Sequence, residues 1–209
     1  MSRITKMVNT AVNKMLFTPQ FIVDHNFFTS SECDFISHHC STLKLKEGEE
    51  YNKYSHIPQQ RRANIAFIDT ITHETQWLYE KFNNIIAHYN DSHFDYDITG
   101  YDYMQYAKYG VGDKHDFHMD LPMGTRMLDY YLTECFRKLS VILLLSEPGV
   151  DFEGGNFEIN HFSEQFPNNA NMRKGTVLIF PSFMLHRVAP ITSGIRQTIS
   201  VWPIGPKFR

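Results

Sequence analysis

The sequence predicts a mainly β domain, an antiparallel sandwich or jelly roll, braced by helices near its N-terminus (α+β). Helical periodicity of apolar residues is confined to the chain before about Asn90. After that residue the sequence changes to short segments rich in Val, Ile, Tyr and Phe, broken by Gly, Pro and Asn, which is typical of strands and turns. The 209 residues are 42% hydrophobic and contain no long polar linker, so one substantial core is expected.

The first predicted helix covers residues 30–43. Thr29 and Glu32 have the spacing of a capping box, in which each side chain satisfies a backbone donor of the other residue. The charged stretch that follows, residues 43–62, shows no sustained period and is interrupted by glycine and proline. A loop is therefore predicted between this helix and the next.

The second predicted helix covers residues 72–89, where apolar residues recur at helical spacing beside Trp77. Those residues are Leu78, Phe82, Ile85, Ile86 and Tyr89. About seven or eight strands are expected in the remaining chain. The candidate strands are residues 98–109, 114–118, 138–145, 156–159, 176–180, 186–188 and 197–202.

Composition and net charge bear on the partner, the redox state of the cysteines and the location of the protein. With 20 Lys and Arg against 23 Asp and Glu, the net charge is about −3, which gives no strong signal for a nucleic-acid partner. Cys33, Cys40 and Cys135 have neither zinc-site spacing nor the density of a disulfide framework, so reduced thiols are expected. No signal peptide or membrane-spanning run is recognised, so a soluble, cytoplasmic protein is expected.

A possible metal centre is indicated by histidine and aspartate spacing. On a strand, residues i and i+2 point the same way, so His118 and Asp120 can supply two ligands from one segment. A third ligand for a 2-His-1-carboxylate iron site must come from a distant strand, and His186 stands where an apolar strand turns and a second strand starts. A second triplet with the same spacing, His93 to Asp95, lies in a polar segment that is interpreted as a solvated connector.

Further positions around these residues form a recognisable pattern. They are Tyr109, Gly112, His118, Asp120, Arg137, Leu139, Ser140, residues 151–155, Lys174, Gly175, Phe180, Pro181, Ser182, His186, Val188, Pro190, Gly194, Arg196, Ser200 and Trp202. In these positions the chain resembles the prolyl 4-hydroxylase-like group of Fe(II)/2-oxoglutarate oxygenases, including PKHD-type hydroxylases of bacteria and phages. The match runs from about residue 100 to the C-terminus and covers about half of the chain.

That resemblance implies a double-stranded β-helix, and because no long polar linker divides the chain, a single domain over residues 1–209 is expected. Residues 1–95 would supply helical support and a lid loop, and residues 96–209 the catalytic β-helix. The implied cofactors are Fe(II), the co-substrate 2-oxoglutarate and O2, with ascorbate as a further candidate. The implied reaction hydroxylates a peptide, an amino acid or another small molecule, prolyl groups among them, and releases succinate and CO2.

The resemblance also assigns site residues. His118, Asp120 and His186 would bind the metal, and Arg196 would bind the far carboxylate of 2-oxoglutarate. Where animal members of the group have a tyrosine that assists this arginine, the chain has Leu144, so Tyr109 and Ser200 are the candidate partners. Gly154 and Gly155 are expected in a tight turn, and Trp202 is expected to pack in the core.

Water must be excluded from such a site during the reaction, so covering segments are expected. The candidates are residues 45–61 and residues 123–134.

Other functions share parts of this pattern. An oxidative nucleic-acid demethylase of the same superfamily would share the triad but should add a basic groove and a further arginine after Arg196, where only Arg209 follows. A jelly-roll binding module without catalysis would be expected to lack one of the three metal-binding residues, and all three are present. A zinc enzyme could use two histidines and one aspartate, but Arg196 has no role in a zinc hydrolase. Oligomeric state is left open by the sequence.

Overall fold

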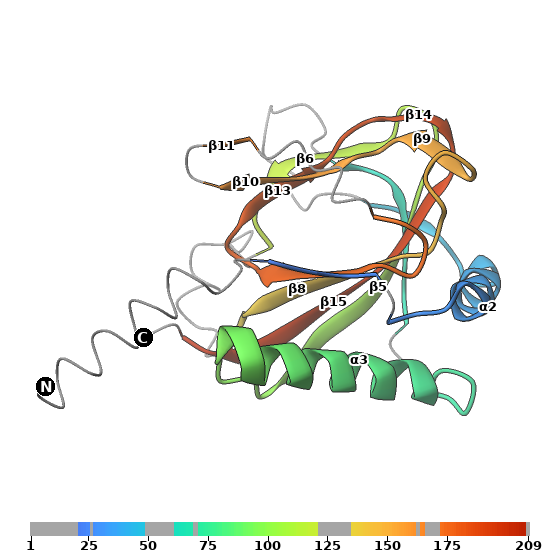
Figure 1. The fold of residues 1–209 in the computed structure, drawn as a ribbon. Coiled ribbons are helices and arrows are strands. Elements are labelled where there is room, and N and C mark those ends of the chain that lie inside the picture. The colour runs from blue at the N-terminus through green and yellow to red at the C-terminus, as the bar shows by residue number, and fades with distance from the viewer. Residues whose placement is uncertain are drawn as a thin grey trace, which may run out of the picture.

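The computed structural model describes residues 21–25, 27–48, 61–68, 71–120, 135–161, 164–165 and 172–207. Within these ranges the chain forms two α-helices, one π-helical turn and fifteen strands (Figure 1). The helical elements are α2 (Ser30–Ser41), α3 (Gln76–Tyr89) and the π-helical η1 (Asn90–Phe94). The strands are β1 (Ile22–Asp24), β2 (Lys46–Glu47), β3 (Arg61–Arg62), β4 (Asn64–Phe67), β5 (Gly100–Tyr109), β6 (Lys114–His118), β7 (Cys135–Arg137), β8 (Leu139–Leu144), β9 (Phe152–Gly154), β10 (Phe157–His161), β11 (Glu164–Gln165), β12 (Val177–Pro181), β13 (Leu185–Val188), β14 (Ile191–Gly194) and β15 (Arg196–Pro206).

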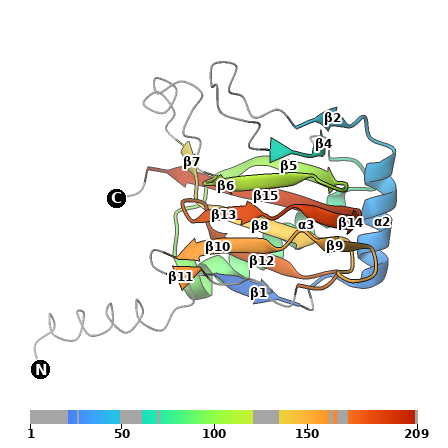
Figure 2. The ribbon, with the colours of Figure 1, turned by 90° about the horizontal axis from the view of Figure 1, so that it is seen from above.

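Two antiparallel sheets face each other. The major sheet has the strand order β1, β12, β8, β15, β5, β4 and β2, with β7 also paired to β15. The minor sheet has the order β11, β10, β13, β6 and β3, and β14 pairs with β9 as a separate ribbon. Seen from above, β10, β13 and β6 lie over the strands of the major sheet (Figure 2). The predicted jelly roll with N-terminal helices is confirmed.

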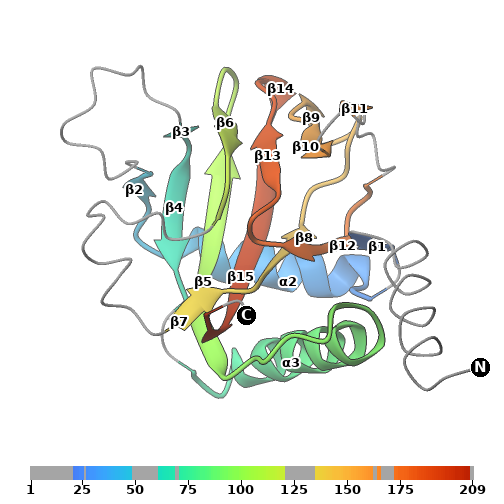
Figure 3. The same cartoon turned by 90° about the vertical axis from the view of Figure 1, so that its left-hand side faces the viewer.

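Both helices lie on the side of the major sheet that faces away from the minor sheet (Figure 3). Helix α2 begins where the sequence predicts: the backbone N–H of Glu32 donates to Thr29 Oγ1 at 3.2 Å, and the backbone N–H of Thr29 donates to Glu32 Oε2 at 2.7 Å. Lys81 of α3 donates from Nζ to Glu32 Oε1 at 2.5 Å. The capping box therefore also links the two helices.

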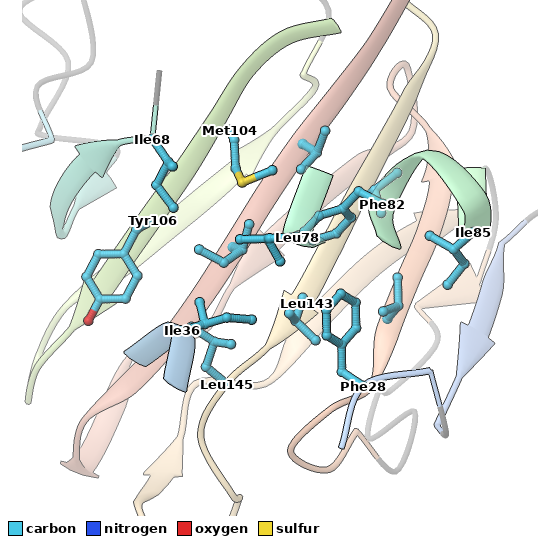
Figure 4. Close-up of a cluster of buried hydrophobic side chains, with 14 of the residues drawn as sticks. Phe28, Ile36, Ile68, Leu78, Phe82, Ile85, Met104, Tyr106, Leu143 and Leu145 are labelled. Atoms are coloured by element: carbon cyan, nitrogen blue, oxygen red, sulfur yellow. The ribbon is translucent and has the colours of Figure 1, made fainter. Parts of the chain in front are cut away.

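A helix-side core fills the space between the helices and the major sheet. Apolar residues of α3 at helical spacing, among them Leu78, Phe82 and Ile85, pack on the sheet side chains Met104 and Leu143 (Figure 4). A second, intersheet core lies between the two sheets. It contains Ala107, Tyr109, Ile142, Leu144, Leu178 and Phe180 from the major sheet and Phe157, Ile159 and Val188 from the minor sheet.

Strand β8 shows why both cores can form on one sheet. Successive side chains of a strand point to opposite faces. Leu139, Val141 and Leu143 therefore join the helix-side core, while Ile142 and Leu144 join the intersheet core. All six residues of β8 are buried, so its sequence is a continuous apolar run with one serine.

The predicted strands are all present, with ends shifted by a few residues, and β15 runs on to Pro206. The loop prediction for residues 43–62 was wrong at both ends, because β2 and β3 fall inside it. These strands are only two residues long and carry charged side chains, so hydrophobic periodicity could not reveal them. Strands β1, β4, β7, β9, β11 and β14 were also missed.

Helix α3 begins at Gln76, four residues later than predicted. The backbone N–H of Thr72 donates to Thr75 Oγ1 at 2.9 Å, so this hydroxyl closes a turn before the helix. Most of the two expected covering segments, residues 45–61 and 123–134, lies outside the described residues. Among the helices that the structure describes, none is both long and apolar enough to cross a membrane.

Candidate metal centre and co-substrate pocket

The three predicted ligands come together at the facing ends of two minor-sheet strands. His118 ends β6 and His186 lies in β13, where the two residues are direct partners in the antiparallel register. Asp120 follows two residues after His118, and its backbone N–H donates to the Ser182 carbonyl at 2.9 Å. One ligand atom of each residue lies within 4.8 Å of the others. This is the arrangement that the H-x-D spacing and the distant histidine predicted.

Backbone carbonyls orient both imidazoles. His118 Nδ1 donates to the Asp116 carbonyl at 2.8 Å, and His186 Nδ1 donates to the Met184 carbonyl at 2.8 Å. Because a carbonyl can only accept, each Nδ1 carries a proton, and in the neutral imidazole the Nε2 atom is then the one with a lone pair for a metal. The Nε2 atoms lie 3.5 Å from the Asp120 carboxylate oxygens, His118 from Oδ1 and His186 from Oδ2.

The Asp120 carboxylate is fixed by two neutral donors. Ser140 Oγ donates to Oδ2 at 2.7 Å and Trp202 Nε1 donates to the same oxygen at 2.8 Å. Burial alone would raise the pKa of Asp120, but His186, His118 and the Trp202 hydrogen bond hold this pKa well below its ordinary value. The carboxylate is therefore ionised at neutral pH.

His186 is held neutral by its surroundings. It is only 2% exposed and lies between the rings of Phe157 and Phe180, whose centroids are 5.3 and 4.8 Å from its own. Burial lowers the pKa of His186 to about 4, although Asp120 acts in the opposite direction. A neutral imidazole is the form that binds a metal.

The donor set fits Fe(II). Two oriented imidazoles and one ionised carboxylate on one side of a cavity form the 2-His-1-carboxylate set of non-haem iron oxygenases. The cavity has a volume of about 230 Å³ and is lined by residues of both sheets. The Nε2 lone pairs and the carboxylate converge at one of its walls, so a metal held there would keep open positions toward the cavity.

Arg196 lies in the same cavity, at the start of β15. It is 2% exposed and faces Tyr109 in the strand register, with its Cζ atom 5.7 Å from the centre of the Tyr109 ring. Burial lowers the pKa of Arg196 to about 10, and Tyr109 acts in the opposite direction. Its stem packs against Gly155, where an added Cβ would come within 3.0 Å of Arg196 Cδ. A buried guanidinium beside a metal site is suited to bind a carboxylate.

The face of β15 that carries Arg196 also carries Thr198, Ser200 and Trp202, because alternate residues of a strand share a face. The predicted partners Tyr109 and Ser200 both line the cavity. The sequence reasoning missed Thr198, which lines it too and stands between Arg196 and Ser200. Counting in steps of two from Arg196 along the predicted strand would have found it.

Leu144 is buried opposite Thr198 in the register of β8 and β15, so it supplies no hydroxyl to this region. Trp202 is buried as expected, but its Nε1 also contacts the carboxylate of the triad. His93 and Asp95 lie in or next to η1, away from the triad, and Asp95 is exposed. Gly154 and Gly155 have φ of +74° and +61°, which agrees with the predicted turn.

Comparisons with known proteins agree with this geometry. Residues 104–203 match the family model of the 2OG-Fe(II) oxygenase superfamily. A PKHD-type hydroxylase of Synechococcus sp. (strain CC9311) is 35% identical over 88 residues, which are 42% of this chain and 35% of that protein. Another, from Hyphomonas neptunium, is 33% identical over 93 residues, which are 44% of this chain and 38% of that protein. The chain thus covers little more than a third of either relative.

Solved structures share the fold at low sequence identity. A Pseudomonas putida prolyl-4-hydroxylase aligns with a TM-score of 0.66 at 16% identity, covering 94% of this chain and 98% of that one. A Trichoplax adhaerens prolyl hydroxylase, in complex with a hypoxia inducible factor peptide fragment, aligns with a TM-score of 0.65 at 21% identity, covering 95% and 89%. Residues 104–203 are therefore similar to 2OG-Fe(II) oxygenases, in a chain that resembles PKHD-type hydroxylases in part of its sequence and prolyl hydroxylases in its fold.

Proposed function

We propose that this protein is an Fe(II)- and 2-oxoglutarate-dependent dioxygenase that hydroxylates a peptide, an amino acid or another small molecule. The observation that carries the proposal is the placement of a buried arginine, Arg196, in the same cavity as a complete His118, Asp120 and His186 triad. The triad alone would suit several metals. A guanidinium beside it adds a carboxylate site, which a metal hydrolase does not need.

Each residue has a distinct role in this proposal. His118, Asp120 and His186 bind Fe(II), and the carbonyls of Asp116 and Met184 keep the two imidazoles aimed at the metal. Arg196 binds the far carboxylate of 2-oxoglutarate, and Tyr109, Thr198 and Ser200 are the nearby hydroxyls that can share it. When bound, iron and 2-oxoglutarate supply the oxidising chemistry toward O2, while the protein supplies position and charge.

The substrate class rests on the relatives. Their names describe PKHD-type hydroxylases and prolyl hydroxylases, one of them crystallised with a peptide fragment. A peptidyl proline is therefore the first candidate substrate, by analogy of fold and motif. We further infer one domain over residues 1–209 and a cytoplasmic location, which three cysteines without a disulfide partner support.

Turnover of 2-oxoglutarate without an added substrate tests the reaction class. The protein with Fe(II) and O2 should convert 2-oxoglutarate slowly to succinate, and the Asp120→Ala variant should not. Mass spectrometry of prolyl peptides should then show a gain of one oxygen that depends on 2-oxoglutarate. A protein that binds Fe(II) but forms no succinate under any of these conditions would contradict the proposal.

A further inference from the structure

Arg61 lines the cavity beside Arg137 and Arg196, and neither the metal nor 2-oxoglutarate is assigned to it. The cavity is lined by Arg61, Arg137 and Arg196, whereas the one carboxylate among its described lining residues is Asp120 of the triad. Like charges in a cleft with low-dielectric walls raise the local concentration of ions of the opposite sign. The cavity therefore favours anionic ligands.

One of the three arginines has an anionic partner in the protein, and another has one in the proposed function. Arg137 binds Asp102 of the protein: its Nε donates to Asp102 Oδ2 at 2.7 Å, and its Nη2 lies 2.6 Å from the same oxygen. The Arg137 guanidinium also stacks on the Trp202 ring at 4.1 Å. Arg196 is assigned to 2-oxoglutarate by the proposed function. Arg61 is left without a carboxylate among the described residues.

Arg61 is positioned by a neutral partner instead. Its Nη2 donates to Gln105 Oε1 at 2.7 Å, and Gln105 is only 7% exposed. Arg61 lies in β3 of the minor sheet and Gln105 in β5 of the major sheet, so this hydrogen bond joins the two sheets across one side of the cavity. Gln105 fixes the guanidinium without neutralising it.

The hydrogen-bonding capacity of Arg61 is incompletely used. Within the ranges that the structure describes, its Nε is buried without a hydrogen-bond partner. The protein's own hydrogen bonds therefore leave part of the anion-binding capacity of this guanidinium unused.

The position of Arg61 is close to the metal ligands. Its partner in the strand register is His115 of β6. The His115 ring stacks on the His118 ring with a centroid distance of 3.4 Å. Arg61 therefore lies one side chain away from the triad, at the wall formed by β3 and β6, whereas Arg196 lies on β15 of the major sheet.

The geometry points to Arg61 as the substrate-binding residue for a carboxylate, with Gln105 as its positioning residue. This inference rests on the proposed function, since it assumes that Arg196 is occupied by 2-oxoglutarate. It narrows the substrate class to molecules that present a carboxylate near the hydroxylated carbon, such as a free amino acid, a peptide C-terminus or an acidic side chain. A carboxylate of 2-oxoglutarate is the other possible source of the same chemistry, and the experiment separates the two.

The test follows the arginine Nε–H signals by NMR in ¹⁵N-labelled protein loaded with Zn(II), which is diamagnetic and does not react with O2. The Arg61 signal is identified by its loss in Arg61→Lys, and the Arg196 signal by its loss in Arg196→Gln. The probe is sodium acetate, added after 2-oxoglutarate, with sodium chloride at equal ionic strength and acetamide as controls.

Acetate should shift the Arg61 signal along a saturating curve, while chloride and acetamide should not. Gln105→Leu should raise the half-saturating acetate concentration about tenfold or more, because a guanidinium without its partner is no longer held in place. Arg62→Lys is the matched control, since Arg62 pairs with Asp113 at 3.1 Å and does not line the cavity. It should leave the titration unchanged.

Two results would overturn the inference. If 2-oxoglutarate alone moves the Arg61 signal and acetate then does not, the co-substrate supplies the carboxylate. If acetate and chloride act alike, Arg61 is not an anion site. Failure of the proposed function gives a different result, because 2-oxoglutarate would then leave the Arg196 signal unchanged.

Discussion

Asp120 shows at the scale of one residue how the site depends on side chains that never touch the metal. Its Oδ2 accepts hydrogen bonds from Ser140 and Trp202, on two different strands of the major sheet, while the metal-facing histidines belong to the minor sheet. The carboxylate is therefore oriented from the opposite sheet. Loss of a group that orients a metal ligand commonly weakens metal binding by about 10- to 100-fold.

Removal of the indole donor tests this orientation. Trp202→Phe keeps an aromatic ring but loses the N–H, so the dissociation constant for Mn(II), a stand-in for Fe(II), should rise about 10- to 100-fold. Isothermal titration calorimetry measures it. Trp77→Phe, on α3 and away from the cavity, is the control and should bind Mn(II) like the wild type. Equal affinity in Trp202→Phe would show that the hydrogen bond does not hold the carboxylate.

Arg196 should control co-substrate affinity without affecting the metal. Hydrogen bonds to charged groups contribute about 1.5 to 3 kcal/mol each, so Arg196→Gln should weaken 2-oxoglutarate binding by about one to three orders of magnitude. Tyr109→Phe, Ser200→Ala and Thr198→Val remove neutral partners and should each cost about 0.5 to 1.5 kcal/mol. The measurement is a titration of 2-oxoglutarate into Mn(II)-loaded protein. Wild-type affinity in Arg196→Gln would mean that the co-substrate binds elsewhere.

The sequence predicted the metal ligands and Arg196, but it did not predict that Arg61 also lines the cavity. His118, Asp120, His186 and Arg196 could be found because strand spacing and a family pattern single them out. Arg61 could not, because it follows a segment without periodicity, and its contact with Gln105 depends on the packing of one sheet on the other.

At the scale of elements, the capping box of α2 contributes a pH-dependent stability. Partial burial raises the pKa of Glu32, but the Lys81 and Thr29 hydrogen bonds outweigh it and leave this pKa below its ordinary value of 4.5. A lowered pKa in the folded state means that the stabilisation is present above the unfolded pKa and is lost as the pH falls through the folded value.

Glu32→Gln keeps a capping-box side chain but removes the charge that faces Lys81 and the helix N-terminus, so it should lower the free energy of unfolding by about 0.5 to 1 kcal/mol at pH 7. The difference from wild type should shrink as the pH falls through the lowered pKa of Glu32. Urea unfolding at several pH values measures it, with Glu74→Gln on the loop before α3 as a control. A difference that does not change with pH would argue against an ionised cap.

Gly155, in the turn after β9, should affect co-substrate binding because its backbone packs against Arg196. Gly155 has φ of +61°, and an added Cβ would lie 2.3 Å from Ile191 Cδ1 and 3.0 Å from Arg196 Cδ. Gly155→Ala should therefore displace Arg196 and weaken 2-oxoglutarate binding about tenfold or more, beyond its cost in stability. Gly149→Ala is the matched control, because Gly149 has φ of +78° but nothing within 4 Å of an added Cβ. Equal 2-oxoglutarate affinity in both variants would contradict this role for Gly155.

Element prediction succeeded where strands are long and buried and failed where they are short and exposed. Strand β8 is predicted by a nearly continuous apolar segment, and β5 by a longer segment rich in tyrosine. Strands β2 and β3 are pairs of charged residues at sheet edges, and only their backbone hydrogen bonds make them strands. The β3 edge nevertheless brings Arg61 to the cavity.

At the scale of the whole molecule, the jelly roll explains how residues far apart in the sequence form one site. The antiparallel pairing of β6 and β13 places His118 directly opposite His186. The facing major sheet supplies Arg196, Ser140 and Trp202 from the other side of the cavity. The fold class was predictable from the change in sequence composition after about residue 90. The pairing of the strands, which determines the charge of the cavity, could be seen only in the structure.

His118, Asp120 and His186 should bind the metal together, and metal stoichiometry is the most direct test of this. Wild type should bind one Mn(II) per chain in calorimetric titration. His118→Ala, Asp120→Ala and His186→Ala should each lose it, because each supplies one of three ligands. His93→Ala, in the other H-x-D triplet, should bind like the wild type. One Mn(II) bound with unchanged affinity by His186→Ala, or metal lost in His93→Ala alone, would contradict the account.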